Sequence, residues 1–142
     1  EYNCRFGDPE TQAVLPLLKS DLLTVMRAVE NETLAETPVE FENKASCCVM
    51  LASGGYPEKY EKGKVIDFGA SESMAQVFHS GTARGDCGNF VTNGGRVLGV
   101  CCVRDTLSEA VDAAYAAANE IHFDKMHFRK DIGARALKGT EV

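Results

Sequence analysis

The clearest pattern along the chain is an unbroken apolar run, ASCCVMLA, over residues 45–52. It stops at SGGYP, and an apolar run of this length that ends at Gly and Pro predicts a buried strand. A second run, RVLGVCCV over residues 96–103, predicts a longer strand entered through Asn93-Gly94-Gly95. Shorter segments predict three further strands, at residues 64–68, 76–79 and 89–92.

A helical pattern follows the last of these strands. Thr106 and Glu109 have the spacing of a capping box, in which each side chain satisfies a backbone N–H at the start of a helix. Alanines and larger apolar residues then recur at helical spacing as far as Ile121. The segment from His122 to Leu137 mixes basic and aromatic residues and allows one more short helix.

Helical signals also mark the beginning of the chain. Asp8 suits an N-cap and Pro9 the first helical position, while Pro16 predicts a break. Ser20 can cap a second, amphipathic run that ends near Val29.

Strands followed by one long helix predict an α+β fold with an antiparallel sheet. The polar stretch at residues 31–43, interrupted by Pro38, predicts a connection between two structural units. We therefore expect a first unit at residues 1–38 and a second at residues 39–142.

Composition adds limits to this picture. The 142 residues are 44% hydrophobic, which suits a compact domain with a real core. A net charge of −6 argues against a generic nucleic-acid binder, which would carry a basic face. No apolar run approaches the ~20 residues of a membrane helix, and no signal segment opens the chain. We expect a protein with no membrane or nucleic-acid partner.

Six cysteines raise the question of disulfides or zinc, but their spacing favours neither. Two adjacent pairs lie in predicted strands, where neighbouring side chains point to opposite faces, and no C-x-x-C pair exists. We interpret these cysteines as small buried hydrophobes in a reducing cytosol.

The first residues hold a candidate site. On a strand, Glu1, Asn3 and Arg5 project from one face, with successive members about 7 Å apart at the Cα atoms. A carboxylate and an amide oxygen can hold Mg²⁺ beside a nucleotide phosphate, and an arginine can stabilise an adjacent anion. An exposed polar strand face explains the same three residues without any ligand.

The chain carries a series of motifs that changes this balance. EYNCRFGDPETQ, LPLLKSDL, LASGGYPEKYEKGK, VFHSGT, VTNGGRVLGV and IHFDKMHFRKDIG closely resemble blocks of the glycinamide ribonucleotide synthetases, in that family's order. The resemblance runs from Glu1 to Leu137. Ser80 stands where the family commonly has alanine, which is a small departure.

The resemblance implies a fold, a reaction and site residues. The fold is the end of an ATP-grasp domain followed by a small C-terminal domain with one long helix. The reaction is ATP-dependent joining of glycine to 5-phosphoribosylamine through an acyl phosphate, in the cytoplasm. At the matching positions Glu1 and Asn3 are ligands of Mg²⁺ or Mn²⁺, and Arg5 lies beside the acyl phosphate. Asp8 is a candidate for substrate recognition, with helix capping as the alternative.

The glycine-rich stretches Asn93-Gly94-Gly95-Arg96 and His79-Ser80-Gly81-Thr82 have two interpretations. Glycine lets a backbone approach a substrate, and Arg96 can bind a phosphate or carboxylate. Alternatively, glycine supplies the positive φ of tight hairpin turns, which is the interpretation we favour. The histidines are interpreted as packing or solvent-facing residues.

The family's enzyme is several times longer than this chain, and no P-loop or Rossmann fingerprint occurs here. Phosphoryl transfer needs several elements at once. We therefore expect the remaining N-terminal domains of the same enzyme as partners, and no catalysis by this segment alone. The alternative is a noncatalytic module that keeps the C-terminal fold for assembly.

Overall fold

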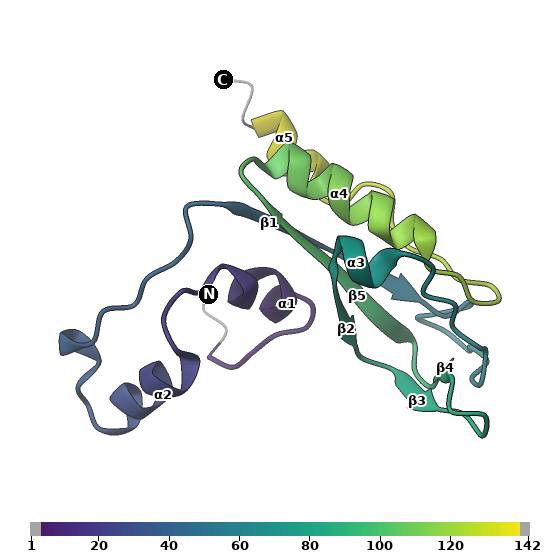
Figure 1. Ribbon diagram of the computed structural model, residues 1–142, viewed down its shortest axis with the longest axis horizontal. Coiled ribbons are helices and arrows are strands. Elements are labelled where there is room, and N and C mark those ends of the chain that lie inside the picture. Colours follow the sequence, from purple (N-terminus) through teal and green to yellow (C-terminus); the bar gives the residue numbers. More distant parts are fainter. Residues whose placement is uncertain (1–3, 140–142) are drawn as a thin grey trace.

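The computed structural model describes residues 4–139 (Figure 1). Glu1 and Asn3, the predicted metal ligands, lie outside the described residues. The elements, in chain order, are α1 (Glu10–Val14), η1 (Leu15–Leu17), α2 (Leu22–Glu30), η2 (Leu34–Glu36), β1 (Ala45–Ala52), α3 (Ser71–Met74), β2 (Gln76–His79), β3 (Thr82–Arg84), β4 (Phe90–Thr92), β5 (Arg96–Arg104), α4 (Leu107–Glu120) and α5 (Ala134–Gly139).

The main sheet is antiparallel and has the order β1-β5-β2, so β5 is its central strand. Cys47 is paired with Cys102 across β1 and β5, and Val49 is paired with Val100. Directly opposed residues on neighbouring strands face the same side of a sheet. Strands β3 and β4 form a separate two-stranded antiparallel sheet. The predicted antiparallel α+β fold is confirmed.

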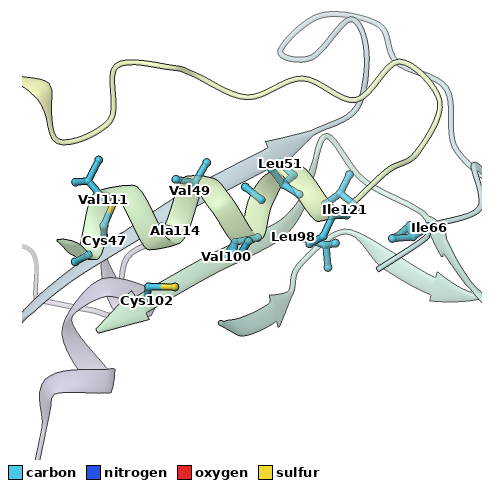
Figure 2. Close-up of a cluster of buried hydrophobic side chains, with 14 of the residues drawn as sticks. Cys47, Val49, Leu51, Ile66, Leu98, Val100, Cys102, Val111, Ala114 and Ile121 are labelled. Carbon is cyan, nitrogen blue, oxygen red and sulfur yellow. The ribbon is translucent and has the colours of Figure 1, made fainter. Parts of the chain in front are cut away.

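The core lies between the main sheet and α4 (Figure 2). Five residues of α4 are buried, and four of them are alanines, whose small side chains let the helix approach the strands closely. The predicted capping box is present: Thr106 Oγ1 accepts from the Glu109 N–H, and the Glu109 carboxylate accepts from the Thr106 N–H. Strands β1 and β5 supply the opposing apolar layer, Cys47, Val49, Leu51, Leu98, Val100 and Cys102.

Helix α1 packs against β1 and β5 on the opposite face of the sheet. There the Ser46 hydroxyl donates to the carbonyl of Ala13, and Gln12 lies next to Gly99. Helix α2 and η2 extend away from the sheet and contact each other (Figure 1). Among the described residues, no helix has the length and apolar character needed to cross a membrane.

Several predicted elements are confirmed. The strand at residues 45–52 has the bounds of β1, and the strand at 76–79 has those of β2. The strand at 96–103 ends one residue later, at Arg104, and the strand at 89–92 begins one residue later, at Phe90. Pro16 lies in the 3₁₀ turn that ends α1, as expected of a helix breaker.

Three local predictions are wrong. Residues 64–68 form no strand and make only single bridges, Val65 to Val91 and Asp67 to His122. Asp8 is not the N-cap, because α1 begins one residue later than predicted, with Pro9 in the cap position. Asp21 rather than Ser20 caps α2, because the Asp21 carboxylate accepts from the Thr24 N–H at 2.7 Å.

The cysteines are all free. Cys47, Cys101 and Cys102 are buried and Cys48 is partly buried, as predicted for small hydrophobes. Cys4 and Cys87 are exposed, so that interpretation does not hold for them.

Candidate functional site

The structure brings two of the predicted site residues together. Arg96 begins the central strand β5, and Asp8 lies in the turn before α1. Arg96 Nη1 donates to the Asp8 carbonyl oxygen at 2.7 Å and lies 3.5 Å from Asp8 Oδ2. The other carboxylate oxygen of Asp8 accepts from Gln12 Nε2 at 2.7 Å. Asp8 therefore anchors Arg96 instead of capping the helix.

A cavity of about 490 Å³ opens beside Arg96. This volume falls in the range of small-molecule sites. Most of its surface is apolar, and its cationic side chains are arginines from two different segments. We call it the Arg96 cavity, and its lining residues are Pro9, Cys48, Met50, Ala52, Tyr56, Pro57, Arg96, His127, Phe128, Arg129 and Ile132.

The glycines beside Arg96 serve close packing. A Cβ on Gly95 would lie 2.1 Å from Tyr56 Cδ2, so the Tyr56 ring occupies the space that a side chain would need. A Cβ on Gly81 would lie 2.6 Å from the Gly94 Cα and from the Arg96 carbonyl oxygen. Neither Gly94 nor Gly95 has a positive φ, so the predicted hairpin explanation is wrong for them. The absence of a side chain allows these backbones to touch.

The two glycine-rich turns, SGGYP and NGGR, are joined directly. Ser53 Oγ donates to the Gly94 carbonyl at 2.8 Å, and the Ser53 N–H donates to the Gly95 carbonyl at 2.8 Å. Ser53 is buried, with 3% of its surface exposed. These bonds place Tyr56 of one turn next to Arg96 of the other, at the cavity.

The remaining wall of the cavity comes from residues 127–132. At its start, the backbones of His127 and Ala52 exchange two hydrogen bonds, of 2.8 and 3.0 Å. At its end, the Tyr115 hydroxyl donates to the Arg129 carbonyl at 2.8 Å and accepts from the Ile132 N–H at 3.0 Å. Tyr115 belongs to α4, so the core helix holds this wall in place.

Cys48 contributes a thiol to the cavity lining, but burial raises its pKa to about 12. It is therefore protonated near neutral pH, and a protonated thiol is a poor nucleophile. Arg129 pairs with Asp131 through two hydrogen bonds, of 2.9 and 2.7 Å, and this guanidinium lowers the pKa of the Asp131 carboxyl. Binding rather than covalent chemistry suits this cavity.

Arg5 lies at a different hollow. Its Nη1 donates to the Phe6 carbonyl at 3.1 Å, and it lines a space of about 120 Å³ together with Glu10 and Val14. Asp8 lines a third hollow, of about 360 Å³, which also contacts His79. The His79 ring packs 4.5 Å from the Phe90 ring, and its Nδ1 lies 3.0 Å from Thr82 Oγ1, in agreement with a packing role.

Metal ligation is not visible in the described part of the chain. Within residues 4–139, no group of three or more His, Cys, Asp or Glu side chains is arranged to hold a metal ion. The predicted ligands Glu1 and Asn3 are outside that range.

Comparison with known proteins decides the family. The model of the phosphoribosylglycinamide synthetase C domain matches residues 46–135, which is more than half of the chain. The chain belongs to this family. The C domain so defined contains the main sheet except for Ala45, the helix α4, and every lining residue of the Arg96 cavity except Pro9.

Similarity to phosphoribosylamine–glycine ligases extends beyond the C domain. The chain is 47% identical over 137 residues to the ligase of Fusobacterium nucleatum, covering 94% of this chain and 32% of that protein. It is 46% identical over 140 residues to the Escherichia coli ligase, covering 97% of this chain and 33% of that protein. A crystal structure of the Thermotoga maritima ligase superposes with a TM-score of 0.74 at 36% identity, covering 93% of this chain and 32% of that chain. The chain therefore spans about a third of the length of these relatives.

The sequence singles out Asp8 and Arg96, but not the wall of the cavity formed by residues 127–132. It places Arg129 in a segment that mixes basic and aromatic residues, and it indicates a packing or solvent-facing role for His127. No local pattern in this segment distinguishes a ligand-lining role from packing.

Proposed function

We propose that this chain is the C-terminal part of an ATP-dependent ligase that joins glycine to 5-phosphoribosylamine. The products are glycinamide ribonucleotide, ADP and phosphate, and the intermediate is glycyl phosphate. The observation that carries the proposal is the Asp8–Arg96 pair at the edge of the Arg96 cavity, in a chain of this family.

The proposed roles follow the chemistry of each side chain. Glu1 and Asn3 bind the Mg²⁺ or Mn²⁺ that holds the ATP phosphates, since carboxylate and amide oxygens suit hard cations. Arg5 stabilises the acyl phosphate through charge-assisted hydrogen bonds. Arg96 binds the substrate, and Asp8 recognises substrate directly or through its hold on Arg96. We place the reaction in the cytoplasm, where free thiols such as those of this chain persist.

We further propose that residues 1–38 complete an ATP-grasp domain and that residues 39–142 are the C-terminal domain. Two observations support this division: the family model begins at residue 46, and exposed apolar side chains concentrate before it. Eight of the ten exposed large apolar residues in the described chain lie before residue 42, and they are Phe6, Val14, Leu23, Met26, Val29, Leu34, Val39 and Phe41. Such a surface needs a partner, and the preceding part of the enzyme is the partner we propose.

The test is a chimera. The part of the Escherichia coli ligase that precedes its match is joined to this chain, and ADP release is measured with glycine and 5-phosphoribosylamine. We expect the chimera to release ADP only when both substrates are present, and the isolated 142-residue chain to release none. The same chimera with Asn3→Ala should lose turnover. Unchanged turnover would contradict the assignment of Asn3 as a metal ligand.

A chimera that folds and binds ATP but does not turn over would contradict the ligase proposal. That result would favour the alternative of a noncatalytic module that retains the C-terminal fold. Circular dichroism and gel filtration of the chimera check that it is folded.

A further inference from the structure

The lining of the Arg96 cavity includes a second arginine, which comes from the segment at residues 127–132. Arg129 lies in the 127–132 segment, and its Nε and Nη2 donate to the two carboxylate oxygens of Asp131. A guanidinium has five N–H donors, and these two bonds leave those of Nη1 for another acceptor. This pair lies at the surface, where the Arg129 and Asp131 side chains are 72% and 63% exposed, so the two bonds favour one orientation of the guanidinium without burying it.

The backbone under Arg129 is held from the protein core. The Tyr115 hydroxyl binds the Arg129 carbonyl and the Ile132 N–H, and the Tyr115 ring lies 6.1 Å from the Phe128 ring. His127 is paired with Ala52 at the end of β1. Arg129 is therefore mounted on a fixed segment, as the side chains of a preformed binding site are.

We propose that Arg129 and Arg96 together bind the phosphomonoester group of the ligand in this cavity, with the sugar over its apolar floor. The proposal deepens the ligase function and rests on it. Arginine suits this task because its planar fork matches a phosphate with paired hydrogen bonds. The floor consists of apolar and aromatic side chains, Met50, Tyr56, Phe128 and Ile132.

The charged side chains of the cavity suit this ligand. Within residues 4–139, its lining includes two arginines and no carboxylate, although the chain has a net charge of −6 and each arginine is paired with an aspartate outside the lining, Arg96 with Asp8 and Arg129 with Asp131. Arg96 uses Nη1 on Asp8, which leaves its other N–H groups for a ligand. A neutral sugar would have no need of either guanidinium.

The experiment compares two substitutions with the same change of charge in the chimera described above. Arg129→Gln removes the cavity guanidinium, and Lys130→Gln removes an exposed cation one residue away that does not line the cavity. We expect Arg129→Gln to raise the KM for 5-phosphoribosylamine about tenfold. The kcat and the KM for glycine should stay within about twofold, because the lost contact is to a group that does not react. Lys130→Gln should change none of these values.

Binding of ribose 5-phosphate, measured by titration calorimetry on the same proteins, gives a readout independent of turnover. We expect Arg129→Gln to weaken it about tenfold, and ribose itself not to bind detectably. Equal weakening by Lys130→Gln, or an unchanged affinity in Arg129→Gln, would overturn the proposal. If a chimera binds ribose 5-phosphate through Arg129 and yet shows no turnover, that result would contradict the ligase function but would support the phosphate site.

Discussion

Arg96 and Asp8 are 88 positions apart in the chain, yet Arg96 Nη1 donates to the Asp8 carbonyl oxygen at 2.7 Å. This bond ties the first strand residue of β5 to the turn before α1. It joins the segment before the family's C domain to the C domain itself, since Asp8 precedes residue 46 and Arg96 follows it.

The Arg96–Asp8 contact is expected to contribute modestly to stability. The two side chains are 39% and 46% exposed, and exposed ion pairs are worth at most about 1 kcal/mol. A double-mutant cycle with Arg96→Ala and Asp8→Asn, measured by urea unfolding, should therefore give a coupling energy of about 0.5 kcal/mol. The carbonyl bond survives Asp8→Asn, so Arg96→Ala alone should cost more than Asp8→Asn alone. The reverse order would contradict this account.

Gly81→Ala is expected to lower the free energy of unfolding by about 2 kcal/mol, because an added Cβ meets backbone atoms that cannot move aside easily. Its nearest neighbours would be the Gly94 Cα and the Arg96 carbonyl oxygen, both at 2.6 Å. Gly139→Ala is the control, since nothing lies within 4 Å of a Cβ at that position. Equal stability of the two variants in thermal unfolding would show that the contact between residues 81 and 94 is loose.

Tyr115→Phe keeps the ring and removes both hydrogen bonds that join the Tyr115 hydroxyl to the cavity wall. We expect a loss of about 1 kcal/mol in unfolding free energy and faster amide exchange at Ile132, whose N–H donates to the hydroxyl. Tyr60→Phe is the matched control, because its hydroxyl makes no hydrogen bond within residues 4–139. Unchanged exchange at Ile132 in Tyr115→Phe would remove Tyr115 from its positioning role.

Thiol labelling should separate the cysteines by burial. At about pH 8, a disulfide reagent should modify the exposed Cys4 and Cys87 rapidly and Cys48 and Cys101 slowly, because only the thiolate reacts. Burial raises the pKa of Cys48 to about 12 and that of Cys101 to about 11. In urea all six cysteines should react alike. Rapid labelling of Cys48 in the folded protein would contradict the burial described here.

The same pKa shifts make stability depend on pH at the alkaline end. A pKa raised by folding means that the folded state favours the protonated thiol. The contribution of the Cys48 thiol to the free energy of unfolding is therefore complete below the ordinary pKa of 9.0. It is lost as the pH rises toward 12. Urea unfolding of Cys48→Ala should show a weaker fall in stability over that range than the unsubstituted chain. If stability falls equally with pH in Cys48→Ala and in the unsubstituted chain, the Cys48 thiol has the same pKa in the folded and unfolded states.

The apolar face of α2 predicts self-association of the isolated chain. Leu23, Met26 and Val29 are 56%, 43% and 58% exposed, and hydrophobic contact between copies would bury them. The double substitution Leu23→Lys with Val29→Lys should shift the sedimentation profile to monomer at high concentration. Glu58→Lys, which makes the same change of net charge at an exposed position outside α2, should leave it unchanged. If the unsubstituted chain is monomeric, the exposed apolar face of α2 does not act as an interface between copies.

The sequence was sufficient for elements whose signals are local. The run at residues 45–52 is bounded by a turn on one side and a polar stretch on the other, so its strand bounds are fixed by neighbouring residues. The same holds for α4, because the capping box marks its start within four residues of the chain.

Predictions failed where distant contacts decide. Residues 64–68 have strand-like composition but make single bridges to two different segments, at Val91 and His122, so no continuous ladder forms. Asp8 has the residue type of an N-cap, but its carboxylate accepts from Gln12 and lies 3.5 Å from Arg96, an arginine 88 positions away. The wall at residues 127–132 is placed by Tyr115 and Ala52, which no local pattern reveals.

The position of Arg96 at the start of the central strand has a thermodynamic consequence. Its backbone pairs with Ala52 on one side and accepts from the Gly81 N–H at 2.9 Å on the other, while its side chain is tethered to Asp8. A free arginine side chain carries about 2 kcal/mol of rotamer entropy. In the folded chain, the bond to Asp8 has already restricted the Arg96 side chain, so part of this entropy is lost before any ligand binds. An anion that binds Arg96 therefore meets a donor with little remaining disorder, and its binding entropy is correspondingly less unfavourable.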